Sequence, residues 1–303
     1  MTERTLKLLV GGLAISVVAW LAAALFSGGA GTISASGEIT HFLDGLEADV
    51  VDAVHIEGPD GPIALLRNGD SWTANGFPAD PEAVELLLAI LPDLRVGDVI
   101  ATNPDNHERM GVSEGVAVKV TFDLNGAPRS LLLGRRGRGF GTAYVRTPAD
   151  DAVYLLHGDL LGQVIRRVDD WRDRVMVRTD TADVVRIAVE RDGDAYTLLR
   201  GDSAWSFEGG DAASPTVIVG ILSELSNLVA SGFLPEGDSI AALERGGGTI
   251  AYSAEGAVLA DISVGTGQAD RWGRTAANDY IYRLTSFRVG RISPTRESAR
   301  PAR

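Results

Sequence analysis

The amino-acid sequence predicts an α+β protein, with an N-terminal transmembrane helix followed by two tandem repeats, each a mainly antiparallel sheet with one amphipathic helix. Three observations predict this class. An uncharged run follows two cations near the start, two nearly identical hairpin phrases recur far apart, and each phrase precedes a helix of the same pattern. A chain of 303 residues with 45% hydrophobic and 23% charged residues has the composition of a folded protein large enough for two domains.

The first expected element is a membrane anchor within residues 1–30. Residues 8–26 carry no charge and follow Arg4 and Lys7. As a helix rising about 1.5 Å per residue, this run covers roughly the 30 Å hydrocarbon layer of a membrane. A cleaved signal peptide is the alternative, but its apolar run is usually shorter. Because the cations precede the run, the positive-inside rule predicts a single-pass protein of the inner (cytoplasmic) membrane, with its N-terminus in the cytoplasm and its bulk in the periplasm or extracytoplasmic space.

The next elements are two hairpins, LLRNGDSW at residues 65–72 and LLRGDSAW at residues 198–205. Each phrase places turn-forming residues between an Arg and a Trp, as a β-hairpin requires. A catalytic residue need survive in only one copy of a duplication, whereas turns and helix caps must survive in both for each copy to fold. We therefore interpret the two phrases as scaffold.

A helix is expected after each hairpin. ADPEAVELLLAILPDL at residues 79–94 aligns with ASPTVIVGILSELSNL at residues 213–228, and the shared apolar positions lie on one helical face. Each segment begins with a capping residue and then a proline, the preferred start of a helix: Asp80 with Pro81, and Ser214 with Pro215.

Further strands and a closing helical turn complete each copy, because DAVYLLHGDLLGQV at residues 151–164 aligns with DYIYRLTSFRVGRI at residues 279–292. We expect repeat unit 1 at residues 48–168 and repeat unit 2 at residues 182–293, joined by a short ordered link. The arginine-rich residues 294–303 are expected to form a basic disordered tail.

Composition argues against several classes of function. The net charge of -13 repels nucleic acid, and the absence of cysteine removes disulfides and zinc-thiolate sites. The histidines, His41, His55, His107 and His157, have no metal-like spacing, and no Walker loop or nucleophile elbow is present. We expect no enzyme activity, no metal and no cofactor.

Two loops carry the residues that we expect to contact a partner. GRRGRGFGT at residues 134–142 leads from one strand into another, unlike a nucleotide-binding loop, and could dock an acidic partner. The longer loop GTGQADRWGRTAAND at residues 265–279 contains a Trp with no counterpart in the first repeat. The candidate contacts are Arg135, Arg136, Arg138, Phe140, Arg271, Trp272 and Arg274.

The order of the short motifs resembles the domain-of-unknown-function family numbered 4340. The residues that carry the resemblance are Trp72, Ala79 with Asp80, Gly111 with Val112, Leu133 with Gly134, Tyr144 with Val145 and Arg146, and Val153 with Tyr154. The second repeat departs from the pattern, because it lacks the Gly-aliphatic pair. The resemblance implies an accessory subunit that accompanies ABC-type transporters of the gliding-motility kind, and it supplies no catalytic residue.

These inferences together predict a non-catalytic, membrane-anchored extracytoplasmic accessory or interaction subunit of an ABC-type transport complex. Its partners would be the inner-membrane ABC permease and associated subunits, and the membrane through the N-terminal helix. One alternative is a periplasmic solute or glycan binding protein, with an apolar pocket and exposed aromatics such as Trp272 at its mouth. A carboxylate-dependent cell-wall hydrolase is a third reading, which requires two buried acids facing one cleft.

Overall fold

The computed structural model describes residues 37–234, 246–265 and 271–301. The chain forms two compact units. Of the described residues, unit 1 contains 37–76 and 81–166, and unit 2 contains 77–80 and those from 167 onward.

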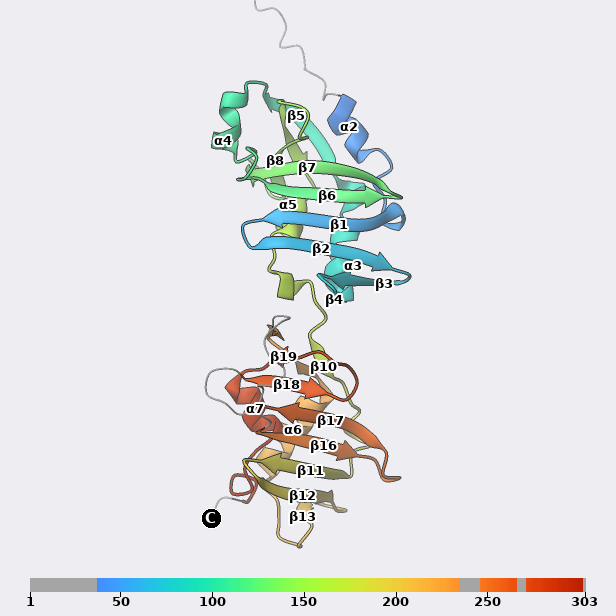
Figure 1. The fold of residues 1–303 in the computed structure, drawn as a ribbon, viewed down its shortest axis with the longest axis vertical. Helices are drawn as coiled ribbons and strands as arrows, with labels where there is room; N and C mark the ends of the chain where they lie inside the picture. Colours follow the sequence, from blue (N-terminus) through green and yellow to red (C-terminus); the bar gives the residue numbers. More distant parts are fainter. Residues whose placement is uncertain (1–36, 235–245, 266–270, 302–303) are drawn as a thin grey trace, which may run out of the picture. The chain divides into compact units, whose positions relative to one another are not determined.

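Within unit 1 the sheet has the order β3-β2-β1-β6-β7-β8-β9-β5 (Figure 1). These strands pair antiparallel. They are β1 (Val51–Gly58), β2 (Gly61–Asn68), β3 (Ser71–Ala74), β5 (Arg95–Ala101), β6 (Val118–Leu124), β7 (Ala127–Arg136), β8 (Thr142–Arg146) and β9 (Val153–His157). The short strand β4 (Phe77–Pro78) falls in residues 77–80, which belong to unit 2. The helices are α2 (Gly37–Leu43), α3 (Pro81–Ala89), α4 (His107–Met110) and α5 (Leu160–Val164).

Unit 2 repeats this plan with an eight-stranded sheet of order β13-β12-β11-β16-β17-β18-β19-β15. Its strands are β11 (Arg186–Arg191), β12 (Asp194–Arg200), β13 (Trp205–Phe207), β15 (Gly232–Phe233), β16 (Gly247–Tyr252), β17 (Val258–Val264), β18 (Trp272–Thr275) and β19 (Tyr282–Arg283). A separate pair consists of β10 (Val175–Val177) and β14 (Leu228–Val229). The helices are α6 (Pro215–Ser226) and α7 (Ser286–Ile292). From β3 and β13 onward the two strand orders match one to one, so the second repeat pairs its strands as the first does.

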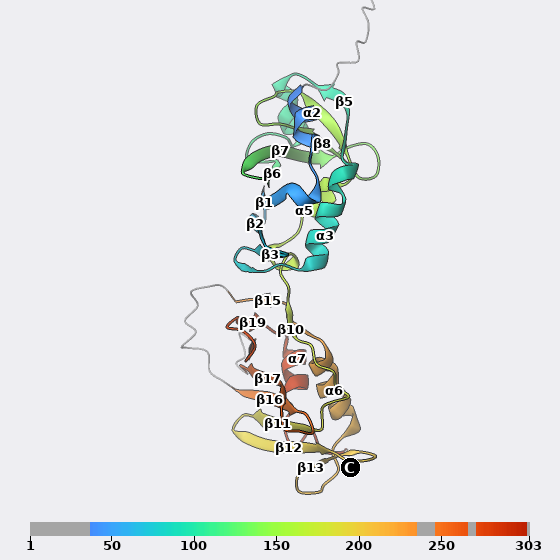
Figure 2. The same ribbon diagram turned by 90° about the vertical axis from the view of Figure 1, so that its right-hand side faces the viewer.

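Each core lies between one face of the sheet and the helices that cover it. In Figure 2, α3 and α5 lie on one side of the unit 1 sheet, and α6 and α7 take the same place in unit 2. The strands alternate accordingly: β6 buries every second residue from Val118 to Leu124, as a strand with one covered face does. In unit 2, Ile187 and Leu198 of the sheet share a core with Ile221 and Leu225 of α6.

The recurring hairpin phrases are scaffold, as the sequence predicts. The guanidinium carbon of Arg67 lies 4.8 Å from the ring centre of Trp72, and that of Arg200 lies 5.4 Å from the ring centre of Trp205. Each arginine also donates a hydrogen bond to the carbonyl oxygen 19 residues earlier. The same stack and the same backbone contact therefore fix the first three strands of both units.

The expected fold class needs correction in its helices. The predicted anchor, residues 1–30, lies outside the described residues, and no helix within the described ranges is long and apolar enough to cross a membrane. The closing helical turn expected in each copy is α5 in unit 1 and α7 in unit 2. The described part of unit 1 also contains two helices that were not expected, α2 and α4. They span seven and four residues, too few for apolar periodicity to mark them in the sequence.

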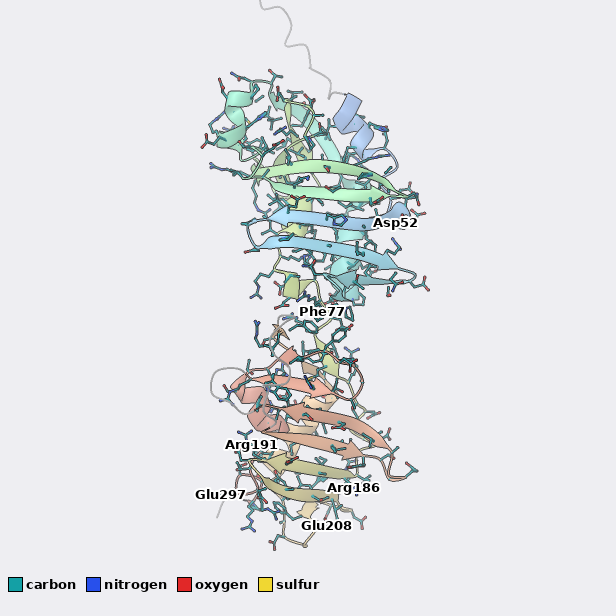
Figure 3. The ribbon with its side chains drawn as sticks, viewed as in Figure 1. Asp52, Phe77, Arg186, Arg191, Glu208 and Glu297 are labelled. Carbon is teal, nitrogen blue, oxygen red and sulfur yellow. The ribbon has the colours of Figure 1, made fainter. Side chains whose placement is uncertain are left out.

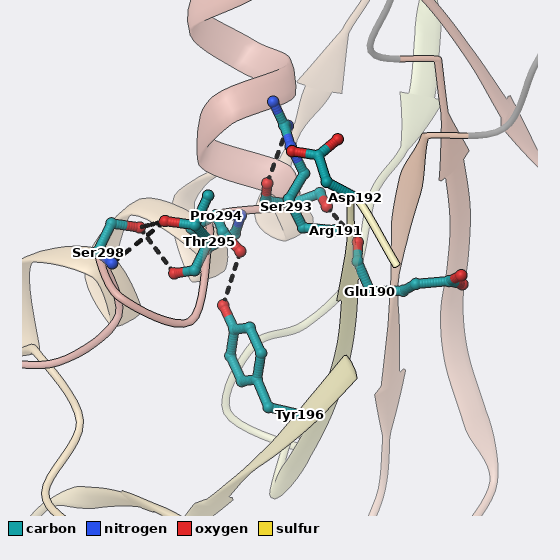
Figure 4. A network of polar contacts seen from close by, with 8 residues as sticks. All are labelled: Glu190, Arg191, Asp192, Tyr196, Ser293, Pro294, Thr295 and Ser298. Atoms are coloured by element: carbon teal, nitrogen blue, oxygen red, sulfur yellow. Dashed lines mark hydrogen bonds and ion pairs between the residues drawn. The ribbon is translucent and has the colours of Figure 1, made fainter. Parts of the chain in front are cut away.

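The predicted disordered tail at residues 294–303 is also corrected for its described part. The hydroxyl of Tyr196 donates a 2.9 Å hydrogen bond to the carbonyl oxygen of Pro294 (Figure 4). Arg296 makes two contacts of 3.0 and 3.1 Å with the carboxylate of Asp194, and Ala299 is buried. The segment is held to β12 by partners about 100 residues away, which local composition does not reveal.

A chain that ends at Ser293 is expected to lose on the order of 2–4 kcal/mol of unit 2 stability, because it loses these contacts and uncovers the Tyr196 ring. Denaturant unfolding of the full chain and the truncated chain measures the difference. A chain ending at Pro301 is the control and should unfold like the full chain. Equal midpoints for all three would contradict the assignment of residues 294–301 to the fold.

Candidate functional site

The turn between β7 and β8 presents the most exposed aromatic side chain among the described residues of unit 1. We call residues 135–141 the β7–β8 tip. Arg135 and Arg136 end β7, and Arg138 and Phe140 lie in the turn that follows. All four side chains are exposed, and Phe140 is 100% exposed.

Backbone hydrogen bonds give the tip a defined conformation. The N–H of Gly137 donates to the carbonyl oxygen of Thr142 over 3.0 Å, and the Thr142 hydroxyl donates to that of Gly139, also over 3.0 Å. Gly139 has a φ of 116°, which residues with a Cβ rarely adopt. The sequence has a glycine where the turn requires a positive φ, and the backbone that carries Phe140 is therefore ordered.

Asp159 ties the tip to the start of α5, and sequence reasoning did not find it. Its N–H donates to the Gly141 carbonyl oxygen over 2.8 Å, and its carboxylate pairs with Arg136 over 3.1 Å. The two partners are 23 residues apart, so no local motif marks them. Within the described part of the chain, no ion pair occupies Arg135 or Arg138, so their charges face solvent.

The base of the tip is anchored at α4 by the motif residues of the family pattern. Gly111 ends α4 in the left-handed conformation at φ 74°, and the turn lies directly on Gly134 of β7. A Cβ on Gly134 would stand 2.3 Å from the carbonyl oxygen of Met110. This close approach explains why a glycine follows Leu133, and it coincides with a register shift between β7 and β8.

The arginine of the Tyr-Val-Arg motif also stabilises this contact between the end of α4 and the sheet. Arg146 is buried and donates to the carbonyl oxygen of Val112 over 2.9 Å. Three more carbonyl oxygens, those of Thr147, Pro148 and Asp150, lie 3.2 to 3.4 Å from its Nη1 atom. The Tyr154 hydroxyl donates to the Asp150 carboxylate over 3.2 Å. These motif residues are structural, and what they position is the tip.

The second predicted contact site contains a strand where its candidate residues are described. Trp272 begins β18, is 5% exposed and packs against Gly265. Arg274 stacks on the Trp272 ring at 5.6 Å, and both Arg271 and Arg274 are half-buried. The prediction of an exposed Trp272 was wrong, because a short strand lies inside a segment whose composition is typical of a loop.

Unit 2 has a shallow hollow of about 410 Å³ on the face of its sheet that the helices leave open. Its floor consists of small residues such as Ala188 and Gly248, and Glu208 lies at its rim near β13 (Figure 3). Arg296 also lines the hollow, but Asp194 already holds its guanidinium group. Its two carboxylates, those of Glu190 and Glu208, belong to exposed residues, and the Tyr196 hydroxyl already donates to the Pro294 carbonyl oxygen.

The buried charges of the described residues also have structural partners. The one buried carboxylate among them, Glu224, lies 2.6 Å from Arg288 and 3.4 Å from Arg291. Buried His107 lies 2.7 Å from the carbonyl oxygen of Asp151. Within the described ranges, no three His, Asp or Glu residues lie close enough together to hold a metal ion.

A family model described as "domain of unknown function (DUF4340)" matches residues 72–244, more than half of the chain. The match begins at the Trp of the first hairpin and extends past α6, so it covers parts of both units. No curated protein and no solved structure matches the chain.

The close approach at Gly134 generates a stability prediction. Gly134→Ala should destabilise unit 1 by about 2–4 kcal/mol, because the rigid Met110 carbonyl cannot move aside without breaking the α4 corner. Thermal or urea unfolding measures the loss. Gly58→Ala is the matched control in the same sheet, since its Cβ would meet Val118 at an ordinary 3.8 Å. Similar stabilities for the two variants would show that α4 does not lie tightly on β7.

Proposed function

The chain belongs to the DUF4340 family, and we propose that it acts as a non-catalytic interaction subunit that binds an anionic partner through the β7–β8 tip. The observation that carries the proposal is Phe140, fully exposed on a structured turn among three arginines. Aromatic and arginine side chains contribute most to binding at protein interfaces. A structured turn loses little conformational entropy when it binds, which favours the use of this tip as a docking element.

The partner that we propose is the permease or an associated subunit of an ABC-type transport complex. The support is the resemblance of the motif order to a family that accompanies such transporters, together with the charge of the tip. The chain as a whole has a net charge of -13, so a partner with an anionic surface is repelled by most of the protein and attracted at the tip. The catalytic step of transport would then belong to another subunit.

We place the two units on the extracytoplasmic side of the inner membrane, and the support is the charge pattern of residues 1–30. The chain contains no cysteine, so one introduced thiol reports its own location. Asp60→Cys, in the exposed turn between β1 and β2, should react with a membrane-impermeant maleimide added to intact spheroplasts. Labelling only after lysis would place the units in the cytoplasm and exclude this location.

Phe140→Ser is expected to weaken partner binding at least tenfold, because it removes an aromatic anchor worth about 1.5–3 kcal/mol when buried. Its stability should stay within about 0.5 kcal/mol of the parent, since the ring makes no contact that the fold needs. Cross-linking from a photoreactive residue at position 140, followed by pull-down of the permease complex, identifies the partner.

The control for this experiment is Val116, an exposed aliphatic residue of the same unit, substituted in the same two ways. Equal cross-linking from positions 116 and 140, or unchanged partner binding by Phe140→Ser, would show that the tip does not contact the partner. Cross-links to a protein outside any transport complex would support the tip as a binding site. They would contradict the proposal that its partner belongs to a transport complex.

The paired change Arg135→Gln with Arg138→Gln is expected to reduce the dependence of partner affinity on salt concentration. These two arginines have no ion pair among the described residues, so the substitutions leave the Arg136–Asp159 contact intact. Titrations at about 0.05 and 0.5 M salt compare the double variant with the parent protein. An unchanged salt dependence would show that the partner does not recognise the cationic charge of the tip.

A further inference from the structure

The exposed side of α6 carries no charged residue. Its exposed positions include Thr216, Val219 and Ser223, and Val219 is 65% exposed. The only charged side chain of the helix, Glu224, is buried. The exposed side of α6 therefore contributes nothing to the net charge of -13.

The duplication supplies an internal comparison for this face. In the sequence alignment of the two repeats, Thr216 and Val219 of α6 correspond to Glu82 and Glu85 of α3. Both glutamates are exposed on α3, the helix of unit 1 that is equivalent to α6. The scaffold therefore accepts acidic residues at these positions, and the fold itself does not require the apolar or neutral residues of unit 2.

Helix α7 also has fewer acidic residues than the aligned segment of unit 1, which contains α5. Phe287 aligns with Asp159 and is 69% exposed, and Arg291 aligns with Gln163. The guanidinium carbon of Arg291 lies 5.3 Å from the Phe287 ring centre, and its Nη2 donates to the Gly220 carbonyl oxygen over 3.3 Å. Arg291 thereby connects Phe287 of α7 to α6 at the residue after Val219.

The cations on this face are held in position. Glu224 pairs with both Arg288 and Arg291, so two guanidinium groups share one carboxylate. One positive charge remains uncompensated within the cluster. An arginine whose orientation is fixed offers its free N–H groups to a carboxylate in a defined geometry.

We propose that the α6–α7 face, defined by Thr216, Val219, Gly220, Ser223, Phe287 and Arg291, binds a protein segment that combines aliphatic side chains with at least one carboxylate. The aliphatic groups would cover Val219 and Phe287, and the carboxylate would meet Arg291. An anionic membrane is the less favourable occupant, because one uncompensated charge attracts little lipid to a strongly acidic protein. This site lies in unit 2 and does not depend on the tip of unit 1.

The test is a photoreactive phenylalanine analogue at position 287 of the full chain, in the cells that produce it, with mass spectrometry of the cross-linked peptide. The expected product is a peptide of another protein that contains aliphatic residues and Asp or Glu. Val219→Glu and Arg291→Gln, each introducing the unit 1 residue at the aligned position, should reduce the yield at least fivefold. The same analogue at Val258, a residue 58% exposed on β17, is the matched control.

Every other result overturns the proposal. Cross-links to a second copy of this chain would make the face a self-association surface, and cross-links to lipid alone would make it a membrane surface. A yield from position 287 no higher than from position 258, or a yield that Val219→Glu leaves unchanged, would show no specific occupant. Circular dichroism of both substituted chains separates lost binding from lost folding. Because Phe140 is untouched, loss of cross-links here leaves the function proposed for the tip standing.

Discussion

The hydrogen bonds of buried Arg146 are the interaction on which the end of unit 1 that carries the β7–β8 tip depends. A guanidinium group removed from water is stable only when its N–H groups find acceptors, and here backbone carbonyl oxygens on both sides of β8 provide them. The same bonds fix the chain that follows α4. The end of α4, at Met110 and Gly111, packs directly on Gly134. Since β8 runs from the tip to Arg146, this clamp sets where Phe140 is presented.

The duplication separates the parts of the protein that maintain the fold from those free to change. Strand order, the Arg–Trp stacks and the helix starts recur in both units, because each unit must fold by the same contacts. The surfaces do not recur. Unit 1 has acidic residues on α3 and a cationic aromatic tip, whereas in unit 2 the exposed side of α6 is uncharged and α7 carries Phe287 and arginines. Differences between equivalent positions are therefore better guides to function than the shared motifs.

Local sequence predicted those features whose causes are local. The hairpins, the starts of α3 and α6, and the exposed glycine-rich tip follow from residues close together in the chain. Local sequence did not predict features that depend on contacts between residues far apart in the chain. Trp272 is buried beside Gly265, in a strand whose composition is typical of a loop. Tyr196 donates a hydrogen bond to Pro294, 98 residues away. Asp159 and the α6–α7 face belong to the same group. Finding them requires knowing which side chains are exposed and which positions share a surface.

The two proposed surfaces share one kind of chemistry. Each combines an exposed phenylalanine with arginines, of which Asp159 pairs with Arg136 at the tip and Glu224 pairs with Arg288 and Arg291 between α6 and α7. The overall charge of -13 repels anionic partners from most other approaches. If both proposals hold, like-charge repulsion over the general surface and attraction at these two sites would give specificity without requiring high affinity at either site. A partner contacting one unit would then be selected as much by what the acidic surface rejects as by what the aromatic residue binds.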